Sequence, residues 1–196
     1  MDGPLIVGIS GASGAIYGIR LLEVLRASGI PAHLIISRSA VQTLNEEMDM
    51  PVEKARALAD VVYSNNDLGA AVSSGSFRTR GMIVIPCSIR TLSDIAYGDT
   101  DTLVSRAADV TLKERRRLVL VVRETPLHAG HLRSMMAATE NGAIIMPPVP
   151  AFYHRPRTID DIVKQTVGRA LDLFDVDAGI VKRWRSAEPL AGEDDE

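Results

Sequence analysis

Short apolar runs alternate along this chain with segments in which apolar residues recur every three or four positions. Uninterrupted apolar runs are typical of buried strands, whereas the longer spacing is typical of amphipathic helices. The runs cover residues 5–10, 32–36, 81–87, 118–122 and 142–146; helices are expected before Gly29, at 39–47, 52–59, 102–114 and 128–139, and from 158 onward. Because strands and helices alternate, the sequence predicts a doubly wound, mostly parallel α/β sheet in a single domain.

The chain is organised around its first turn, Gly11-Ala-Ser-Gly14, which joins the first strand to the first helix. Glycine lets backbone N–H groups approach an anion closely, and a helix N-terminus adds partial positive charge. The turn is therefore suited to a phosphate or to the edge of a flavin. It matches neither the G-x-G-x-x-G dinucleotide fingerprint nor a P-loop. The alternative is that its small residues serve only the packing of helix on sheet.

Ligands of such sheets bind beyond the carboxyl ends of the strands. Five stretches of this sequence fall there: residues 11–14, Ser37, residues 87–91, Arg123 with Glu124, and the proline-rich residues 147–156. We therefore expect the functional site at this edge. The polar connection over residues 63–80 is long, and long connections are often functional.

Composition narrows the class of protein. The chain has 196 residues, 22 basic and 25 acidic, with a net charge of −3, which favours no nucleic acid partner. No apolar run is long enough to span a membrane, and no signal peptide pattern is present, so a cytoplasmic protein is expected. A single cysteine, Cys87, fits a reducing compartment, and its place in an apolar strand favours burial over nucleophilic chemistry. Residues 1–184 are expected to form the domain and residues 185–196 an acidic, disordered tail.

Charged residues suggest two anion sites. Arg106, Asp109 and Lys113 share one face of a predicted helix, either as a solvated face on which Asp109 bridges two cations or as a phosphate clamp. Arg123 and Glu124 end a buried strand, where they form either a salt bridge at the rim or an anion-binding arginine beside a proton donor.

Other polar residues have simpler interpretations. Tyr153 and Arg169 could hold a phosphate together, although the sequence alone leaves this open. His128 and His131 have metal-ligand spacing but no evident third ligand, so no metal site is predicted. Asp160 and Asp161 are expected to cap the last helix, with Thr158 and Asp161 at capping-box spacing. The run at 115–117 is interpreted as a solvated helix end.

Several motifs in this order resemble the UbiX family of flavin prenyltransferases. They are Gly11-Ala-Ser-Gly-Ala15, Ser74-Gly-Ser-Phe77, Ile85-Pro-Cys-Ser88, Thr91-Leu-Ser93, Arg106-Ala-Ala-Asp-Val-x-Leu-Lys-Glu-Arg115, Arg123-Glu-Thr-Pro-Leu127, Pro148-x-Pro-Ala-Phe-Tyr153 and Arg183-Trp184. The resemblance spans residues 5–184 and implies a Rossmann-like or flavodoxin-like fold in a homo-oligomer, commonly a dodecamer. One departure is His131-Leu-Arg-Ser-Met135, where the family pattern is His-Leu-Glu-Asn-Met.

The resemblance implies a reaction in which a dimethylallyl group passes from dimethylallyl monophosphate to N5 and C6 of reduced FMN, without metal. The product, prenylated FMN, would serve a UbiD-type decarboxylase. By resemblance, FMN is bound by Gly11, Ala12, Ser13, Ser37, Ser88, Ile89, Arg90, Thr91 and Arg123. The prenyl phosphate is bound by Arg106, Lys113, Tyr153 and Arg169. The implied catalytic residues are Glu47 and Glu124, as acid/base carboxylates, with Lys113 and Ser13.

Two other functions remain open from the sequence. The chain could be a carrier that binds FMN and delivers it to a decarboxylase without chemistry. It could also be a flavin-dependent cysteine decarboxylase, although the active histidine and asparagine-rich loop of that class are not evident.

Overall fold

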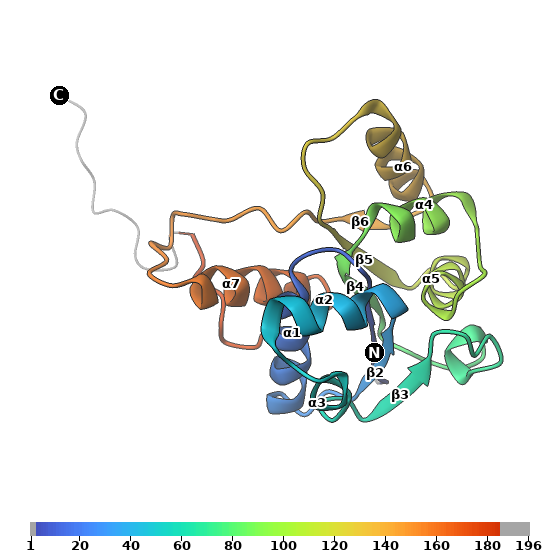
Figure 1. Cartoon of the computed structure of the whole chain (residues 1–196), viewed down its shortest axis with the longest axis horizontal. Coiled ribbons are helices and arrows are strands. Elements are labelled where there is room, and N and C mark those ends of the chain that lie inside the picture. Colours follow the sequence, from blue (N-terminus) through green and yellow to red (C-terminus); the bar gives the residue numbers. More distant parts are fainter. Residues whose placement is uncertain (1–2, 185–196) are drawn as a thin grey trace.

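A single six-stranded sheet forms the centre of the protein. The computed structural model describes residues 3–184. The strands are β1 (Leu5–Ile9), β2 (Ala32–Ile36), β3 (Val61–Ser64), β4 (Gly81–Cys87), β5 (Arg117–Val122) and β6 (Ile144–Ile145). All pairs are parallel, in the order β3-β2-β1-β4-β5-β6 (Figure 1). The predicted parallel α/β fold is therefore confirmed.

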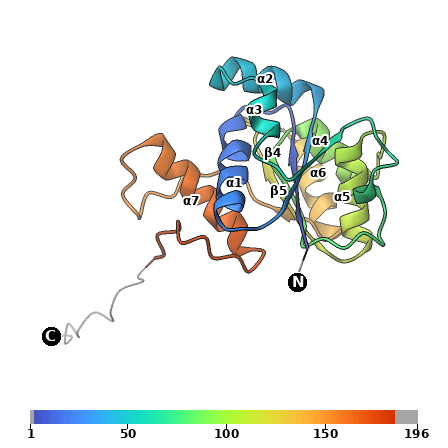
Figure 2. The same cartoon turned by 90° about the horizontal axis from the view of Figure 1, so that it is seen from below.

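Helices cover both faces of this sheet (Figures 1 and 2). One face carries α1 (Ala15–Ala27), α2 (Arg38–Met48), α3 (Val52–Arg56) and α7 (Ile159–Asp172). The other carries α4 (Ile89–Tyr97), α5 (Leu103–Lys113) and α6 (Ala129–Glu140). Along β4, Ile83 and Ile85 pack on the first face, whereas Met82 and Val84 pack on the second. Each helix layer thus packs on its own apolar core, and each central strand contributes alternate side chains to the two cores.

The central strands lie where the apolar runs predicted them, because both faces of these strands are buried. Every residue of β4 is buried, which is why the run over residues 81–87 is uninterrupted. The two edge strands differ from expectation. β3 was not predicted, because its apolar run is only three residues long, Val61 to Tyr63, and polar residues flank it on both sides. The run at 142–146 contributes only two residues of strand.

The last helix starts at its predicted cap. Thr158 and Asp161 form a capping box, in which each side chain accepts a backbone N–H of the other residue. Thr102 caps α5 in the same way together with Ser105. The segment predicted as a helix over 52–59 ends as α3 at Arg56.

The connection from β3 to β4 contains one short 3₁₀ turn, η1 (Ala71–Ser73), and packs beside α5. Arg116 holds it there by donating to the carbonyls of Gly75 at 2.6 Å and Phe77 at 2.7 Å. The prediction that residues 115–117 are a solvated helix end is therefore wrong for two of them, since Arg116 binds the connection and Arg117 begins β5.

Within residues 3–184, no helix is both long and apolar enough to cross a membrane. The segment predicted as an acidic tail, residues 185–196, lies outside the described residues.

Candidate functional site

The carboxyl ends of β1, β4 and β5 lie side by side, and the expected site residues follow them. Beyond them lies a pocket of about 450 Å³. It is lined by Ser13, Gly14, Tyr17, Val122, Arg123, Glu124, Thr125, Pro147, Pro148, Val149 and Pro150. The structure thus brings three of the five predicted stretches together in one cavity, namely the first turn, Arg123 with Glu124, and the proline-rich loop.

The first turn is held by a carboxylate from α2. Gly14, with φ at 101°, turns the chain into α1. Glu47 accepts the N–H of Gly14 at 2.8 Å and that of Ala15 at 3.0 Å. An anion therefore does bind at this helix N-terminus, as the glycines indicated, but it is the protein's own carboxylate.

The environment of Glu47 favours its charged form. Partial burial acts to raise its pKa, but hydrogen bonds from the Ser13 side chain and from the Gly14 and Ala15 backbone outweigh it, and the charge of Arg123 adds to them. The net result is a lowered pKa. Glu47, Ser13 and Arg123, which the sequence named separately, are therefore electrostatically linked.

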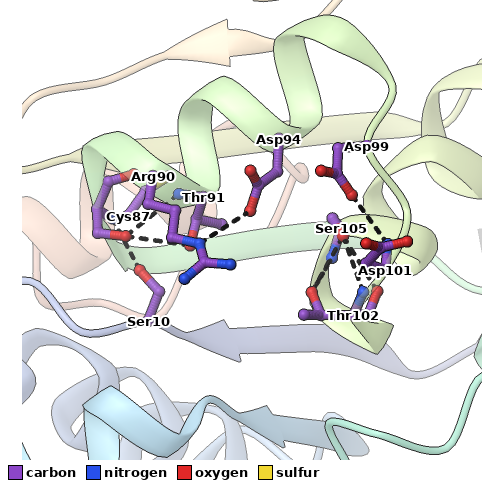
Figure 3. Close-up of polar contacts among 10 residues, drawn as sticks. Ser10, Cys87, Arg90, Thr91, Asp94, Asp99, Asp101, Thr102 and Ser105 are labelled. Carbon is purple, nitrogen blue, oxygen red and sulfur yellow. Dashed lines mark hydrogen bonds and ion pairs between the residues drawn. The ribbon is translucent and has the colours of Figure 1, made fainter.

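The predicted serines act as helix caps at the same edge. Ser37 begins α2 by accepting the N–H of Ala40 at 3.1 Å. Ser88 begins α4 by accepting the N–H of Thr91 at 3.3 Å, and its hydroxyl donates to that of Thr91 at 3.1 Å. Behind them, Ser10 donates to the Pro86 carbonyl at 2.9 Å. Its hydroxyl oxygen also accepts the N–H of Ser88 at 2.8 Å (Figure 3). Two helix N-termini are thereby fixed next to the first turn.

The other residues near these caps differ in exposure. Ala12 is buried in the turn, whereas Gly11 is exposed, and a Cβ on Gly11 would lie 2.2 Å from Cβ of Ser39. This close approach explains a glycine at the position. Ile89 packs against the core beneath α4, and Arg90 extends outward to Asp94 at 3.9 Å (Figure 3).

Arg123 and Glu124 follow β5 directly and border the pocket. The Arg123 N–H donates to the carbonyl of Cys87 at 3.0 Å, which ties the end of β5 to that of β4. Glu124 accepts the N–H of Thr125 at 3.0 Å. Cys87 itself is buried and burial raises its pKa, so the expectation of a structural cysteine is confirmed.

The two cations of α5 have separate acidic partners. Arg106 pairs with Asp109 at 3.1 Å, and Lys113 pairs with Glu114 at 2.5 Å. The alternative in which Asp109 bridges both cations is therefore wrong. Lys113 and Asp109 border a second hollow, of about 550 Å³, with Tyr97 and Arg115.

Tyr153 and Arg169 lie on the other side of the sheet, near α7. The Tyr153 hydroxyl accepts a hydrogen bond from Gln165 at 2.9 Å, and its ring meets that of Trp184 edge-on, with centroids 5.4 Å apart. Arg169 pairs with Asp172 at 2.5 Å. Because α5 and α7 cover opposite faces (Figure 1), one chain does not bring the four predicted phosphate ligands together.

The sequence missed the aromatic wall of the pocket. Tyr17 borders it from α1, and burial raises the pKa of its hydroxyl against a hydrogen bond with Thr166. The available signal was its position three residues after Gly14. Side chains on a helix tilt toward its N-terminus, which is the end of α1 that borders the pocket.

The histidines at 128 and 131 have a structural explanation. Nδ1 of His128 accepts the N–H of Gly130 at 2.9 Å, which makes it the cap of α6. The two rings are in contact, with centroids 3.6 Å apart and their planes tilted by 33°. Across the described part of the chain, no group of three potential metal ligands occurs.

Comparison with known proteins identifies the family to which the chain is similar. The flavoprotein family matches residues 2–171. The chain is 59% identical over 186 residues to the flavin prenyltransferase UbiX of Escherichia coli K12, covering 93% of this chain and 98% of that protein.

Two solved structures are similar over nearly their whole length. The AnUbiX (PadA1) structure, in complex with FMN and dimethylallyl pyrophosphate, has a TM-score of 0.93 and 52% identity, covering 96% of this chain and 100% of that one. A dodecameric FMN-dependent UbiX-like decarboxylase from Escherichia coli O157:H7 has a TM-score of 0.90 and 48% identity, covering 92% and 98%.

The lowered pKa of Glu47 predicts an acid-dependent loss of stability. A carboxylate with a depressed pKa stabilises the folded state fully above its unfolded value of 4.5, and this stabilisation is lost as pH falls through the lower folded-state value. Glu47→Gln should therefore lower the unfolding free energy at pH 7 by about 0.5–1 kcal/mol. The effect is expected to be this small because solvent partly screens the charge of the exposed Glu47 carboxylate. Once the pH has fallen through that lower folded-state value, the variant and wild type should converge.

Denaturant unfolding at several pH values and one protein concentration measures this effect. The matched control is Glu46→Gln, which changes the exposed neighbour on α2. A difference between Glu47→Gln and wild type that stays constant from pH 7 to pH 3 would contradict the assigned capping role.

Proposed function

This chain belongs to the flavoprotein family and, within it, to the flavin prenyltransferases of the UbiX type, and we propose that it joins a dimethylallyl group from dimethylallyl monophosphate to N5 and C6 of reduced FMN. The observation that carries the proposal is the pocket at the carboxyl ends of β1 and β5. It combines hydroxyl, guanidinium and carboxyl groups in a chain that is 59% identical to a flavin prenyltransferase.

The FMN site fits the topology. Strand order reverses between β1 and β4, and parallel sheets bind ligands in the crevice at such a switch point. We assign FMN to the first turn, to the capped helix starts at Ser37 and Ser88, and to Arg123. Because Glu47 already accepts two N–H groups of α1, we assign the FMN phosphate to the starts of α2 and α4.

The chain's own residues would promote transfer through charge. Breaking the C–O bond leaves negative charge on phosphate, which arginine, lysine and tyrosine groups can stabilise without a metal ion. Glu124 borders the same pocket as Ser13 and Arg123, so it can deliver or accept a proton at the reacting flavin or phosphate. When bound, reduced FMN supplies the nucleophilic N5 and C6 atoms.

We assign the prenyl phosphate to Arg106, Lys113, Tyr153 and Arg169 from more than one subunit. Two of these residues lie on α5 and two near α7, on opposite faces of the sheet. A second copy is therefore needed to complete the set. The dodecameric assembly of the Escherichia coli O157:H7 relative supports an oligomer of this kind.

We further propose that a UbiD-type decarboxylase receives the prenylated FMN and that the reaction takes place in the cytoplasm. The reduced, buried Cys87 agrees with that compartment. The carrier alternative differs from transfer in one respect, namely that FMN would be recovered unchanged.

The product of the reaction tests the activity directly. The protein is incubated under anaerobic conditions with FMN, a reductant and dimethylallyl monophosphate, and the released flavin is analysed by mass spectrometry. We expect FMN to gain one dimethylallyl group only when the donor is present. Recovery of unmodified FMN in the presence of both substrates would support the carrier function instead.

Glu124→Gln separates proton transfer from binding. Glutamine keeps the shape of the side chain and an acceptor for the Thr125 N–H but cannot transfer a proton. We expect unchanged FMN affinity and prenylation slowed by about 10²–10⁴-fold, the usual contribution of general acid–base catalysis. Rapid mixing with flavin absorbance measures the rate. A variant within a few-fold of wild type would assign Glu124 a structural role.

A mixing experiment tests the shared phosphate site. Lys113→Ala and Arg169→Ala each damage one half of it. If the halves come from different chains, co-assembled variants should restore about a quarter of the sites, because random mixing places an intact half of each kind together at that frequency. Prenylation is measured at low donor concentration, with separately assembled variants mixed afterwards as the control. Activity equal to the mean of the two variants would indicate that one chain supplies both halves.

A further inference from the structure

The loop Ser74-Gly-Ser-Phe77 has no role in the site described so far, yet it is firmly attached to the end of α5. Arg116 donates to two of its carbonyls, those of Gly75 at 2.6 Å and Phe77 at 2.7 Å. The hydroxyls of Ser74 and Ser76 lie 2.9 Å apart across the turn. The loop is thus fixed beside Lys113, the cation assigned to the prenyl phosphate.

The Lys113–Glu114 ion pair lies directly over Gly75. The ammonium and carboxylate are 2.5 Å apart. A Cβ on Gly75 would lie 2.0 Å from Oε1 of Glu114 and 2.7 Å from Nζ of Lys113. Glycine therefore provides the space in which the pair is placed, because any side chain there would displace it.

We propose that Glu114 and Gly75 are positioning residues, which hold the ammonium of Lys113 where it receives the prenyl phosphate. The proposal rests on the assignment of Lys113 made above. A lysine has a long flexible stem, and fixing it in advance reduces the loss of freedom on binding. The ammonium has three donors, so one can remain on Glu114 while two bind phosphate.

Charge and exposure agree with this arrangement. The hydrogen bond and the charge of Lys113 lower the pKa of Glu114, so its carboxylate stays ionised near neutral pH. Lys113 is half exposed and borders the hollow of about 550 Å³ between α4 and α5. The ammonium is therefore held on one side and open to a ligand on the other.

Gly75→Ala tests the proposal without straining the backbone, because Gly75 lies outside the left-handed region and its new Cβ meets only the ends of flexible side chains. We expect the KM for dimethylallyl monophosphate to rise about 5–10-fold, less than the roughly 10–100-fold expected for Lys113→Ala, which removes the charged hydrogen bond altogether. We expect kcat and the affinity for FMN to change by less than about two-fold. Glu114→Gln should have a similar effect on KM.

Two controls separate positioning from general damage. Gly69→Ala lies on the same connection, and its Cβ would meet only Asp67 Oδ1 at 3.5 Å, so its KM should equal that of wild type. Glu53→Gln removes an exposed carboxylate that pairs with Arg56 on α3 and should also have no effect.

A double-mutant cycle gives the decisive readout. If Gly75 acts through Lys113, adding Gly75→Ala to Lys113→Ala should raise KM no further. Full additivity would overturn the proposal, as would an unchanged or lowered KM in both Gly75→Ala and Glu114→Gln. If Gly75→Ala and Glu114→Gln match wild type while Lys113→Ala raises KM, the assignment of Lys113 to the prenyl phosphate stands, and only the positioning role of Gly75 and Glu114 is overturned. If Lys113→Ala leaves KM unchanged, the assignment of Lys113 fails and positioning fails with it.

Discussion

The parallel pairing of β1 with β4 at the centre of the sheet is the constraint on which the site depends. It places the first turn beside the start of α4, and it requires α1 to pack closely on both strands. Gly18 permits this approach, because a Cβ there would lie 2.7 Å from the Ile85 carbonyl and 2.8 Å from Cδ1 of Ile9. With β5 joined to β4 through the Arg123 N–H, three loops meet at one edge.

Carboxylates accompany the proposed ligand-binding cations throughout this protein. Arg106 pairs with Asp109, Lys113 with Glu114 and Arg169 with Asp172. Glu47 likewise compensates the positive end of α1. Such partners fix long side chains before a phosphate binds, and they limit repulsion between cations that would be gathered around one phosphate. An exposed pair of this kind adds little stability, so positioning accounts better for its presence than stability does.

Sequence reasoning located the edge of the sheet at which the pocket lies and the cap of the last helix, because these features depend on local chemistry. A buried strand such as β4 must be apolar throughout, and Thr158 with Asp161 caps a helix wherever that helix lies. Sequence reasoning failed where a segment is ordered by contacts with residues far away in the sequence. The exposed strand β3 is ordered by pairing with β2, and Arg116 binds a loop from an earlier part of the chain.

The sequence by itself determined the parallel α/β architecture, the family resemblance and the chemical types available at the strand ends. Only the tertiary structure decided which groups meet. It placed the Glu47 carboxylate on the first turn, from 33 residues away, and Lys113 with Glu114 over Gly75. It also separated the α5 cations from Tyr153 and Arg169 on opposite faces of the sheet. The physical reason is that periodicity and capping act within a few residues, whereas the meeting of two side chains depends on how whole elements pack.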